Sequence, residues 1–261
     1  MIKISEFPVT HSEDAISLNL LSYNMQVAIG SHRVHHMISH GWRYVMPHGQ
    51  SVSNLERIAR ILSNYDIVAL NEADAGSLRT RFINQAHYLR EKAGYEYCDQ
   101  MITRDIGRFA QHSNSLLSRV PPKAVYRHRL PSLRDGRGVL EAHFQIRGHQ
   151  VVILITHLSL RRKARMAQIE YIADIVNRYR SVIVMGDMNC TIDSPEMGRL
   201  FARTGLSGPE HTPATFPSWN PVRAIDHILV SRDMTVTDIS TLTEPLSDHL
   251  ALRATIKICC S

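Results

Sequence analysis

Cysteine is scarce in this sequence: only four of the 261 residues are Cys, with neither CxxC spacing nor the density of a disulfide framework. No stretch approaches the run of about 18 apolar residues that spans a bilayer. The first residues lack the apolar core and the cleavage site of a signal peptide. These absences argue against a disulfide-stabilised or membrane-spanning protein. We therefore expect a cytoplasmic protein with reduced thiols and no integral membrane association.

The composition is otherwise that of a globular protein, with 44% hydrophobic and 21% charged residues. It excludes a disordered chain, a collagen-like repeat and a coiled coil. The net charge of +6 is a weak indication of a polyanionic partner, and the fifteen His are an unusually large reserve of titratable side chains. No repeat or long linker interrupts the chain, and we expect one domain over residues 1–261. The oligomeric state stays open, with a monomer favoured.

Short apolar runs typical of strands alternate with stretches of helical periodicity. Strands are expected at 18–24, 66–70, 115–118, 139–146, 151–156, 181–185, 225–230, 235–242 and 250–256. Helices are expected after Ser53, where Ser53 and Glu56 have capping-box spacing, over 82–93 with Gly94 as the stop, and through the apolar stripe at 169–176. Residues 147–149 are expected to turn a hairpin. This order predicts a mixed α/β fold whose sheets are covered by helices.

Polar side chains repeatedly follow the apolar runs at once. They are Asn24, Glu72, His157, Asp187 with Asn189, Asp226 with His227, and Asp248 with His249. A lone Asp or Asn after a strand is usually a turn or cap residue. Burying so many polar groups singly would be costly, however, which favours one shared cleft. Asp187 and Asn189, two apart on an extended backbone, are expected to point the same way.

Seven short motifs carry a more specific signal. In chain order they are LSYN (21–24), NEAD (71–74), HSNSLLSR (112–119), THL (156–158), GDMN (186–189), IDHIL (225–229) and SDHL (247–250). Each is weak alone, but the ordered set resembles the endonuclease/exonuclease/phosphatase (DNase I-like) superfamily. The resemblance implies a four-layer α/β sandwich, in which two mixed β-sheets pack face to face and are flanked by helices.

The chemistry of these side chains favours a hard cation, because carboxylate and amide oxygens suit Mg²⁺ or Mn²⁺. The resemblance implies that Glu72 is the principal metal carboxylate, with Asp248 and Asn24 close by. It also implies that Asp187 and Asn189 border the scissile phosphate and the attacking water.

A histidine titrates near neutral pH and therefore suits the role of general base, for which we choose His249. The resemblance assigns its orientation to Asp226 and gives His157 a phosphate contact or a role at the leaving group. His227 is expected to face away. The looser matches are His112 and Asn114 as substrate contacts and Arg137 as a phosphate ligand. Asn71 stands where the family more often has Gln, which puts the hydrogen bond of that side chain in doubt.

These residues together predict a divalent-metal-dependent phosphodiesterase, with DNA or RNA as the first substrate class to test. A basic cluster (Arg161, Arg162, Lys163 and Arg165) could contact a phosphate backbone or could be a solvated helix start. The alternatives are hydrolysis of a phospholipid headgroup or an inositol phosphate, and a metal-binding scaffold without catalysis. A histidine-rich insertion from His32 to His48 has three open interpretations: a polar surface loop, a second metal site, or a segment that borders the cleft and sets specificity.

Overall fold

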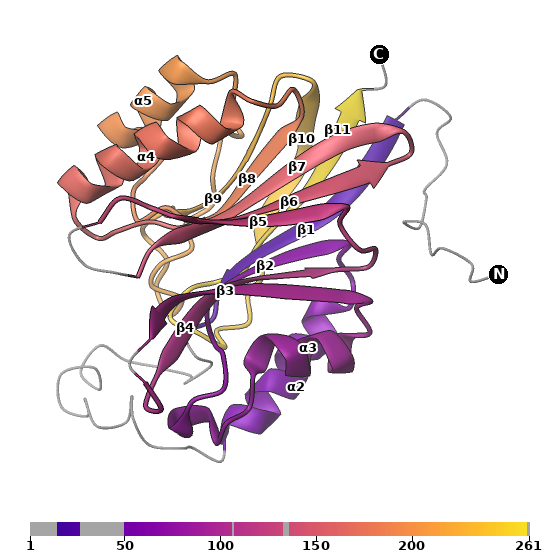
Figure 1. Ribbon diagram of the computed structural model, residues 1–261, viewed down its shortest axis with the longest axis vertical. Helices are drawn as coiled ribbons and strands as arrows, with labels where there is room; N and C mark the ends of the chain where they lie inside the picture. The colour runs from indigo at the N-terminus through magenta and orange to yellow at the C-terminus, as the bar shows by residue number, and fades with distance from the viewer. Residues whose placement is uncertain (1–14, 27–49, 106, 133–135, 260–261) are drawn as a thin grey trace.

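The computed structural model describes residues 15–26, 50–105, 107–132 and 136–259 (Figure 1). The histidine-rich insertion, including His32 and His40, lies outside the described residues. The described strands form two sheets, and four helices lie outside them.

The first sheet has six strands, in the order β10-β11-β1-β2-β4-β3. These are β1 (Ala15–Asn24), β2 (Ile67–Asp74), β3 (Tyr97–Asp105), β4 (Gln111–Ser118), β10 (Met234–Thr241) and β11 (Leu252–Cys259). The β1–β2 pair is parallel and the other pairs are antiparallel. The sheet is therefore mixed, and β1 and β2 end at the same edge.

The second sheet has five strands, in the order β5-β6-β7-β8-β9. They are β5 (Ala124–Arg129), β6 (Gly138–Ile146), β7 (His149–His157), β8 (Val182–Asp187) and β9 (Asp226–Val230). Only β7 and β8 pair in parallel. The hairpin between β6 and β7 turns at Arg147 and Gly148, whose φ values of 47° and 86° are typical of a two-residue type I′ turn.

The two sheets face each other across a core of aliphatic side chains, to which Leu18 and Ile67 contribute from the first sheet and Phe144 and Ile153 from the second. The outer face of the first sheet is covered by α2 (Gln50–Leu62) and α3 (Gln85–Ala93), with the 3₁₀ turn η3 (Leu78–Thr80) nearby. The outer face of the second is covered by α4 (Arg162–Val176) and α5 (Pro195–Arg203). Figure 1 shows the four layers, which confirm the predicted sandwich.

Strands buried on both faces explain why the apolar runs are nearly continuous. In β1, Leu18 and Leu20 enter the core between the sheets, whereas Leu21 and Tyr23 pack against α2 and α3. The stripe of α2, from Leu55 to Leu62, is buried as predicted. Alternation in β1 therefore separates two hydrophobic environments rather than core and solvent.

Helix starts were predicted less well than helix faces. The helix α2 begins at Gln50, so Ser53 lies inside it and the expected capping box is wrong. The helix α3 begins at Gln85 rather than 82, because the side chain of Asn84 accepts a hydrogen bond from the amide of His87 and caps the helix there. Gly94 ends it with φ 74°, as predicted.

A buried carboxylate lies under α4 in the second sheet. Glu141 of β6 is 1% exposed and is hydrogen-bonded to Nε2 of His128 at 2.7 Å, Nε2 of His143 at 2.5 Å and the hydroxyl of Tyr179 at 2.7 Å. Burial would raise the pKa of Glu141, but the hydrogen bonds from His143, Tyr179 and His128 outweigh it and lower the pKa. The group is thus a charged buried acceptor whose partners come from two strands and the segment after α4.

Candidate active site

The polar residues at the strand ends of both sheets meet at one edge of the sandwich. Asn24, at the end of β1, donates from Nδ2 to Oδ2 of Asp187, at the end of β8, at 3.0 Å. The backbone amide of Asp187 donates to Oδ1 of Asn71 in β2, also at 3.0 Å. Two hydrogen bonds therefore tie the two sheets together at Asp187.

His249 and Asp226 form a buried pair beside Asp187. Nδ1 of His249 lies 2.7 Å from Oδ2 of Asp226, and the same oxygen accepts a hydrogen bond from the hydroxyl of Thr215 at 2.6 Å. The ring of Phe216 lies 4.9 Å from the ring of His249. These contacts fix the imidazole, and its Nε2 points toward Oδ2 of Asp187 at 3.8 Å.

The charges around His249 change its proton affinity. Burial lowers the pKa of His249, but Asp226, Asp187 and Asp248 outweigh burial and raise it to about 10. Burial raises the pKa of Asp187 to about 7, and Asp226 adds to this while His249 opposes it. Near neutral pH His249 is thus an imidazolium in this arrangement, whereas the sequence suggested a histidine with an ordinary pKa.

Asp187 and Asn189 lie together for a different reason from the one expected. The strand β8 ends at Asp187, and Asn189 has a left-handed φ of 53°, so the rule for side chains two apart on a strand does not apply. Instead the amide of Asn189 donates to Oδ1 of Asp187 at 2.8 Å, and Nδ2 of Asn189 donates to the carbonyl of Leu158 at 2.8 Å. The pair is held by a turn rather than by strand alternation.

Glu72 projects into the cleft from a β-bulge. Asn71 pairs with Asn114 and Ala73 with Ser113, so Glu72 is the extra residue in β2, and its φ of 58° is left-handed. Such a conformation is costly for a residue with a Cβ and is concentrated at functional sites. The bulge turns the carboxylate toward the cleft.

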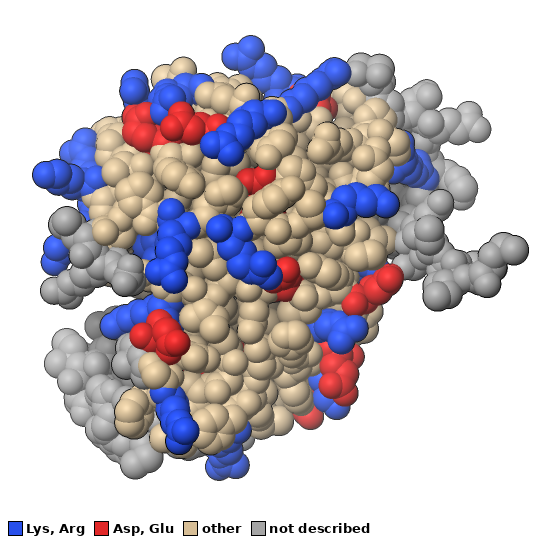
Figure 2. Space-filling model, viewed as in Figure 1, with Lys and Arg blue, Asp and Glu red and all other residues tan. Residues whose placement is uncertain are grey.

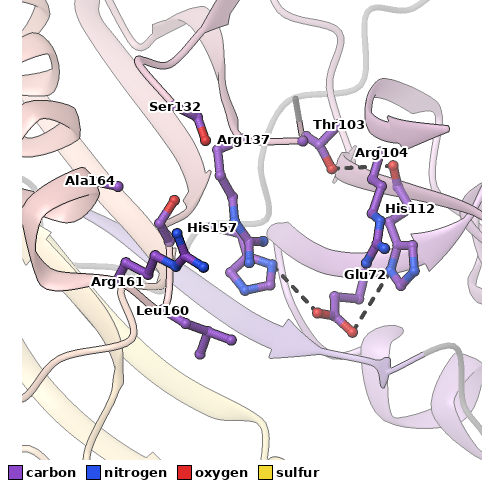
Figure 3. Close-up of a pocket in the computed structure, with 12 residues that line it drawn as sticks. Glu72, Thr103, Arg104, His112, Ser132, Arg137, His157, Leu160, Arg161 and Ala164 are labelled. Atoms are coloured by element: carbon purple, nitrogen blue, oxygen red, sulfur yellow. Dashed lines mark hydrogen bonds and ion pairs between the residues drawn. The ribbon is translucent and has the colours of Figure 1, made fainter. Parts of the chain in front are cut away.

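Two histidines flank Glu72 (Figure 3). Its carboxylate oxygens lie 3.8 Å from Nδ1 of His112 and 3.8 Å from Nδ1 of His157. Nε2 of His157 lies 3.4 Å from Oδ2 of Asp187, so His157 stands between the two carboxylates. Burial, together with Arg137, His249 and His112, holds the pKa of His157 well below its ordinary value. His157 is therefore neutral near pH 7.

The structure places Asn114 behind the cleft surface. It is 1% exposed, accepts a hydrogen bond from Nδ2 of Asn71 at 2.9 Å and donates to the carbonyl of Gly138 at 2.9 Å. With these bonds Asn114 holds Asn71, which in turn holds Asp187. The shorter Asn71 side chain thus reaches both partners, so the doubt raised by the absence of Gln is resolved.

A cleft of about 310 Å³ opens beside Glu72. Besides Glu72, its lining includes Arg104, His112, Arg137, His157 and Arg161 (Figure 3). Burial lowers the pKa of Arg137, while Glu72 and Asp187 oppose that effect, so its guanidinium is a cation beside the two carboxylates. Arg137 thus lines the same cleft as Glu72, and its role as a phosphate ligand stays a prediction. Arg104 had no signal in the sequence.

The basic cluster at the start of α4 separates into two parts. Arg165 pairs with the buried carboxylate of Glu196 at 2.7 Å, and Arg162 lies 3.7 Å from the same group. Only Arg161 of the four lines the cleft. His227 faces away from the cleft, as expected: it is 1% exposed and its Nε2 lies 2.8 Å from the carbonyl of Cys190.

Besides Glu72, a second group of donors could hold a hard divalent cation. Ligand atoms of Asp187, Asp226 and His249 lie within 4.8 Å of one another. Both oxygens of Asp187 and Oδ2 of Asp226 already accept hydrogen bonds there, so a cation would have to displace them. Asp248, whose pKa is raised by burial, lies beside His249 and accepts a hydrogen bond from Ser247 at 3.1 Å.

Helices long and apolar enough to cross a membrane are not found among the described residues. Cys98, Cys190 and Cys259 are free thiols.

A six-stranded and a five-stranded mixed sheet, packed face to face with acidic, amide and imidazole groups at one edge, define a DNase I-like α/β sandwich. The chain belongs to the Endonuclease/Exonuclease/phosphatase family, whose model matches residues 21–249. Members include nucleases and phosphatases, act on phosphoester bonds and generally use a divalent metal ion.

Solved structures with the same fold come from several organisms. An endonuclease/exonuclease/phosphatase from Beutenbergia cavernae is 19% identical, with a TM-score of 0.72 over 93% of this chain and 72% of that chain. A mannosyl-6-phosphatase from Bacteroides thetaiotaomicron is 16% identical, with a TM-score of 0.68 over 92% and 99% of the two chains. The human Nocturnin catalytic domain with bound sulfate is 15% identical, with a TM-score of 0.66 over 94% and 97%. No curated protein matches the sequence.

Proposed function

We propose that this protein is a divalent-metal-dependent phosphodiesterase that cleaves DNA or RNA. One observation carries the proposal: the Asp226–His249 pair, Asp187, His157 and Glu72 converge from both sheets on the edge where Arg137 lines a cleft. Metal-assisted attack of water on a phosphoester requires an oriented base, a metal carboxylate and cations at the phosphate, and each has a candidate here.

The metal ion would be held by Glu72, with Asn24 and Asp248 as further oxygen donors. When bound, it would polarise a phosphoryl oxygen and offset charge on the leaving group. The rest of the mechanism is assigned to side chains. Arg137 contacts the scissile phosphate, and neutral His157 hydrogen-bonds to a phosphate oxygen.

His249, oriented by Asp226, is the proposed acceptor of the proton from water. It can accept only when neutral, and both Asp226 and Asp187 favour its charged form. Protonation of Asp187 removes one of these negative charges. Asp187 and His249, whose Oδ2 and Nε2 atoms lie 3.8 Å apart, therefore act as a coupled pair. The reaction requires the state of the pair in which His249 is neutral.

The test is hydrolysis by the purified protein with Mg²⁺ or Mn²⁺. Plasmid, single-stranded DNA, RNA, sphingomyelin and bis(4-nitrophenyl) phosphate are the substrates. The expected result is cleavage of nucleic acid and of the chromogenic diester, abolished by EDTA. Glu72→Gln and His249→Ala are expected to lose at least about 10²-fold in kcat.

The exposed neighbours Glu210 and His211 supply matched controls, because Glu210→Gln and His211→Ala make the same chemical changes at residues that do not line the cleft. Both should keep wild-type rates. Activity on sphingomyelin alone, or full activity in Glu72→Gln, would contradict the proposal.

A further inference from the structure

The cleft beside Glu72 has more positive charge than one phosphodiester requires. Arg104 on β3, Arg137 just before β6 and Arg161 just before α4 all line it (Figure 3). In Figure 3, Arg137 and Arg161 lie on one side of the space in front of Glu72, and Arg104 lies on the other, beside His112. A phosphodiester has one negative charge, and Glu72 is the only carboxylate among the described lining residues.

Arg104 and Arg161 form no ion pair with a described carboxylate, whereas Arg137 interacts electrostatically with Glu72 and Asp187. Within the described part of the chain, no carboxylate lies within 4.0 Å of a guanidinium nitrogen of Arg104, Arg137 or Arg161. Arg162 and Arg165, which follow directly, both pair with Glu196. Arg162 and Arg165 thus form ion pairs within the protein. Arg104 and Arg161 form none with a described carboxylate, so their guanidinium groups can bind an anionic group of a ligand.

The start of α4 adds to the positive electrostatic potential of the cleft. Its N-cap residue is Arg161, which makes no side-chain capping bond, and its first turn contains no acidic residue. Acidic side chains normally occupy this position, because the amides at a helix start carry partial positive charge. Arg161 and Ala164 both line the cleft, so the positive end of a 15-residue helix borders it.

The shape of the cleft favours a compact anion. Its volume of about 310 Å³ is at the lower end of the range for small-molecule pockets, roughly 300–1,000 Å³. On the face in Figure 2, Lys and Arg side chains are spread among uncharged and acidic residues and do not form a continuous track. A discrete phosphate group suits this arrangement better than a long backbone, since a terminal phosphate carries nearly two charges at neutral pH.

We propose that the cleft holds a second phosphate group of the substrate, bound by Arg104 and Arg161 while Arg137 serves the scissile phosphate. Thr103, Ser132 and Ser159, which also line the cleft, supply uncharged hydrogen-bonding groups. The inference rests on the proposed function, and it narrows the substrate to a nucleotide or nucleic acid end that carries a terminal phosphate near the cleaved bond.

The test compares two small substrates that differ only in this group. They are thymidine 5′-(4-nitrophenyl phosphate) with and without a 3′-phosphate, assayed with Mg²⁺ or Mn²⁺ by nitrophenol release. The wild-type protein is expected to prefer the 3′-phosphorylated compound by about 10–100-fold in kcat/KM, the range for hydrogen bonds to charged groups. Arg104→Ala and Arg161→Ala should each reduce this ratio toward one.

Arg162→Ala is the matched control. It removes another exposed arginine at the same helix start, but one that pairs with Glu196, and it should keep the wild-type ratio. A wild-type ratio of one, or a ratio that Arg104→Ala and Arg161→Ala leave unchanged, would overturn the inference.

The outcomes separate this inference from the proposed function. If neither compound, nor bis(4-nitrophenyl) phosphate, nor DNA or RNA is hydrolysed, the proposed function fails. If the unphosphorylated compound is hydrolysed and the ratio is one, only the second-phosphate site fails. The last comparison uses oligonucleotides with and without a terminal phosphate. Faster cleavage of the phosphorylated oligonucleotide assigns the second phosphate to a nucleic acid end. A preference seen only with the small compounds assigns it to a free nucleotide.

Discussion

Gly186 offers the sharpest test of how the fold positions the candidate active site. It has a φ of 136°, and a Cβ placed on it would lie 1.9 Å from the carbonyl oxygen of Thr156 and 3.0 Å from Oδ1 of Asn71. Real Cβ atoms essentially never approach a heavy atom closer than 3.0 Å. Gly186→Ala therefore requires a backbone movement of at least about 1 Å between β7 and β8.

The movement would reach the site directly. Thr156 pairs with Gly186, and the next pair in the register is His157 with Asp187. Overpacking and an unfavourable φ together cost about 3–5 kcal/mol of unfolding free energy. A displacement of about 1 Å at reacting groups costs roughly 10²-fold in rate. Urea unfolding and kcat/KM for bis(4-nitrophenyl) phosphate measure the two effects.

Two other glycines serve as controls for the effect of adding a methyl group without the clash between Gly186 and Thr156. Gly148 has φ 86° and nothing within 4 Å of an added Cβ, so Gly148→Ala should cost only about 1 kcal/mol and leave activity unchanged. Gly198, inside α5, has open space and an ordinary φ, so Gly198→Ala should stabilise by about 0.5–1 kcal/mol. Wild-type stability and rate in Gly186→Ala would show that the close approach of Gly186 to Thr156 does not position the site.

Three further variants test other parts of the account. Asp187→Asn should lower the pKa of His249 from about 10 by roughly 1–3, because one of the flanking carboxylates is lost. NMR titration of the imidazole measures this shift. An unchanged pKa would count against coupling between Asp187 and His249. Glu141→Gln should destabilise by about 1–3 kcal/mol at pH 7. The folded-state pKa of Glu141 is lowered, so its stabilisation is complete above its unfolded pKa and is lost as the pH falls through the folded pKa; urea unfolding at several pH values should show the difference shrinking in acid. Asn71→Ala removes the acceptor for the Asp187 amide and should lower kcat about 10-fold with little change in KM, and wild-type kinetics would exclude the positioning role.

The layers of the fold could be predicted from the sequence because buried strands leave a strong signal. The runs that became β7 and β8 are apolar on both faces, since one face meets the other sheet and the opposite face meets α4 and α5. The strands β3 and β5 were missed, because both are edge strands whose sequences are rich in polar and charged residues. The helix α5 was also missed, although Ser194 and Pro195 have the form of an N-cap and a first helical residue.

The candidate site was predicted by residue type but not by geometry. The seven motifs identified the side chains that meet at the edge of the sandwich. They could not show that Glu72 sits in a bulge or that Asn189 is held by a turn, because both positions have a left-handed φ in non-glycine residues. Thr215 and Arg104 carry no motif, and only the packing of distant segments brings them to Asp226 and to the cleft.

Transfer of ¹⁸O from water to the phosphate product shows directly whether the protein hydrolyses a phosphoester at this cleft. Wild-type protein and Glu72→Gln are incubated with thymidine 5′-(4-nitrophenyl phosphate) in ¹⁸O-labelled water with Mg²⁺ or Mn²⁺. The masses of the products are then measured by mass spectrometry. We expect one ¹⁸O atom in the phosphate of the thymidine 5′-phosphate formed by the wild type, and at least about 10²-fold less product with Glu72→Gln. No labelled phosphate from the wild type, or equal amounts from both proteins, would contradict this expectation.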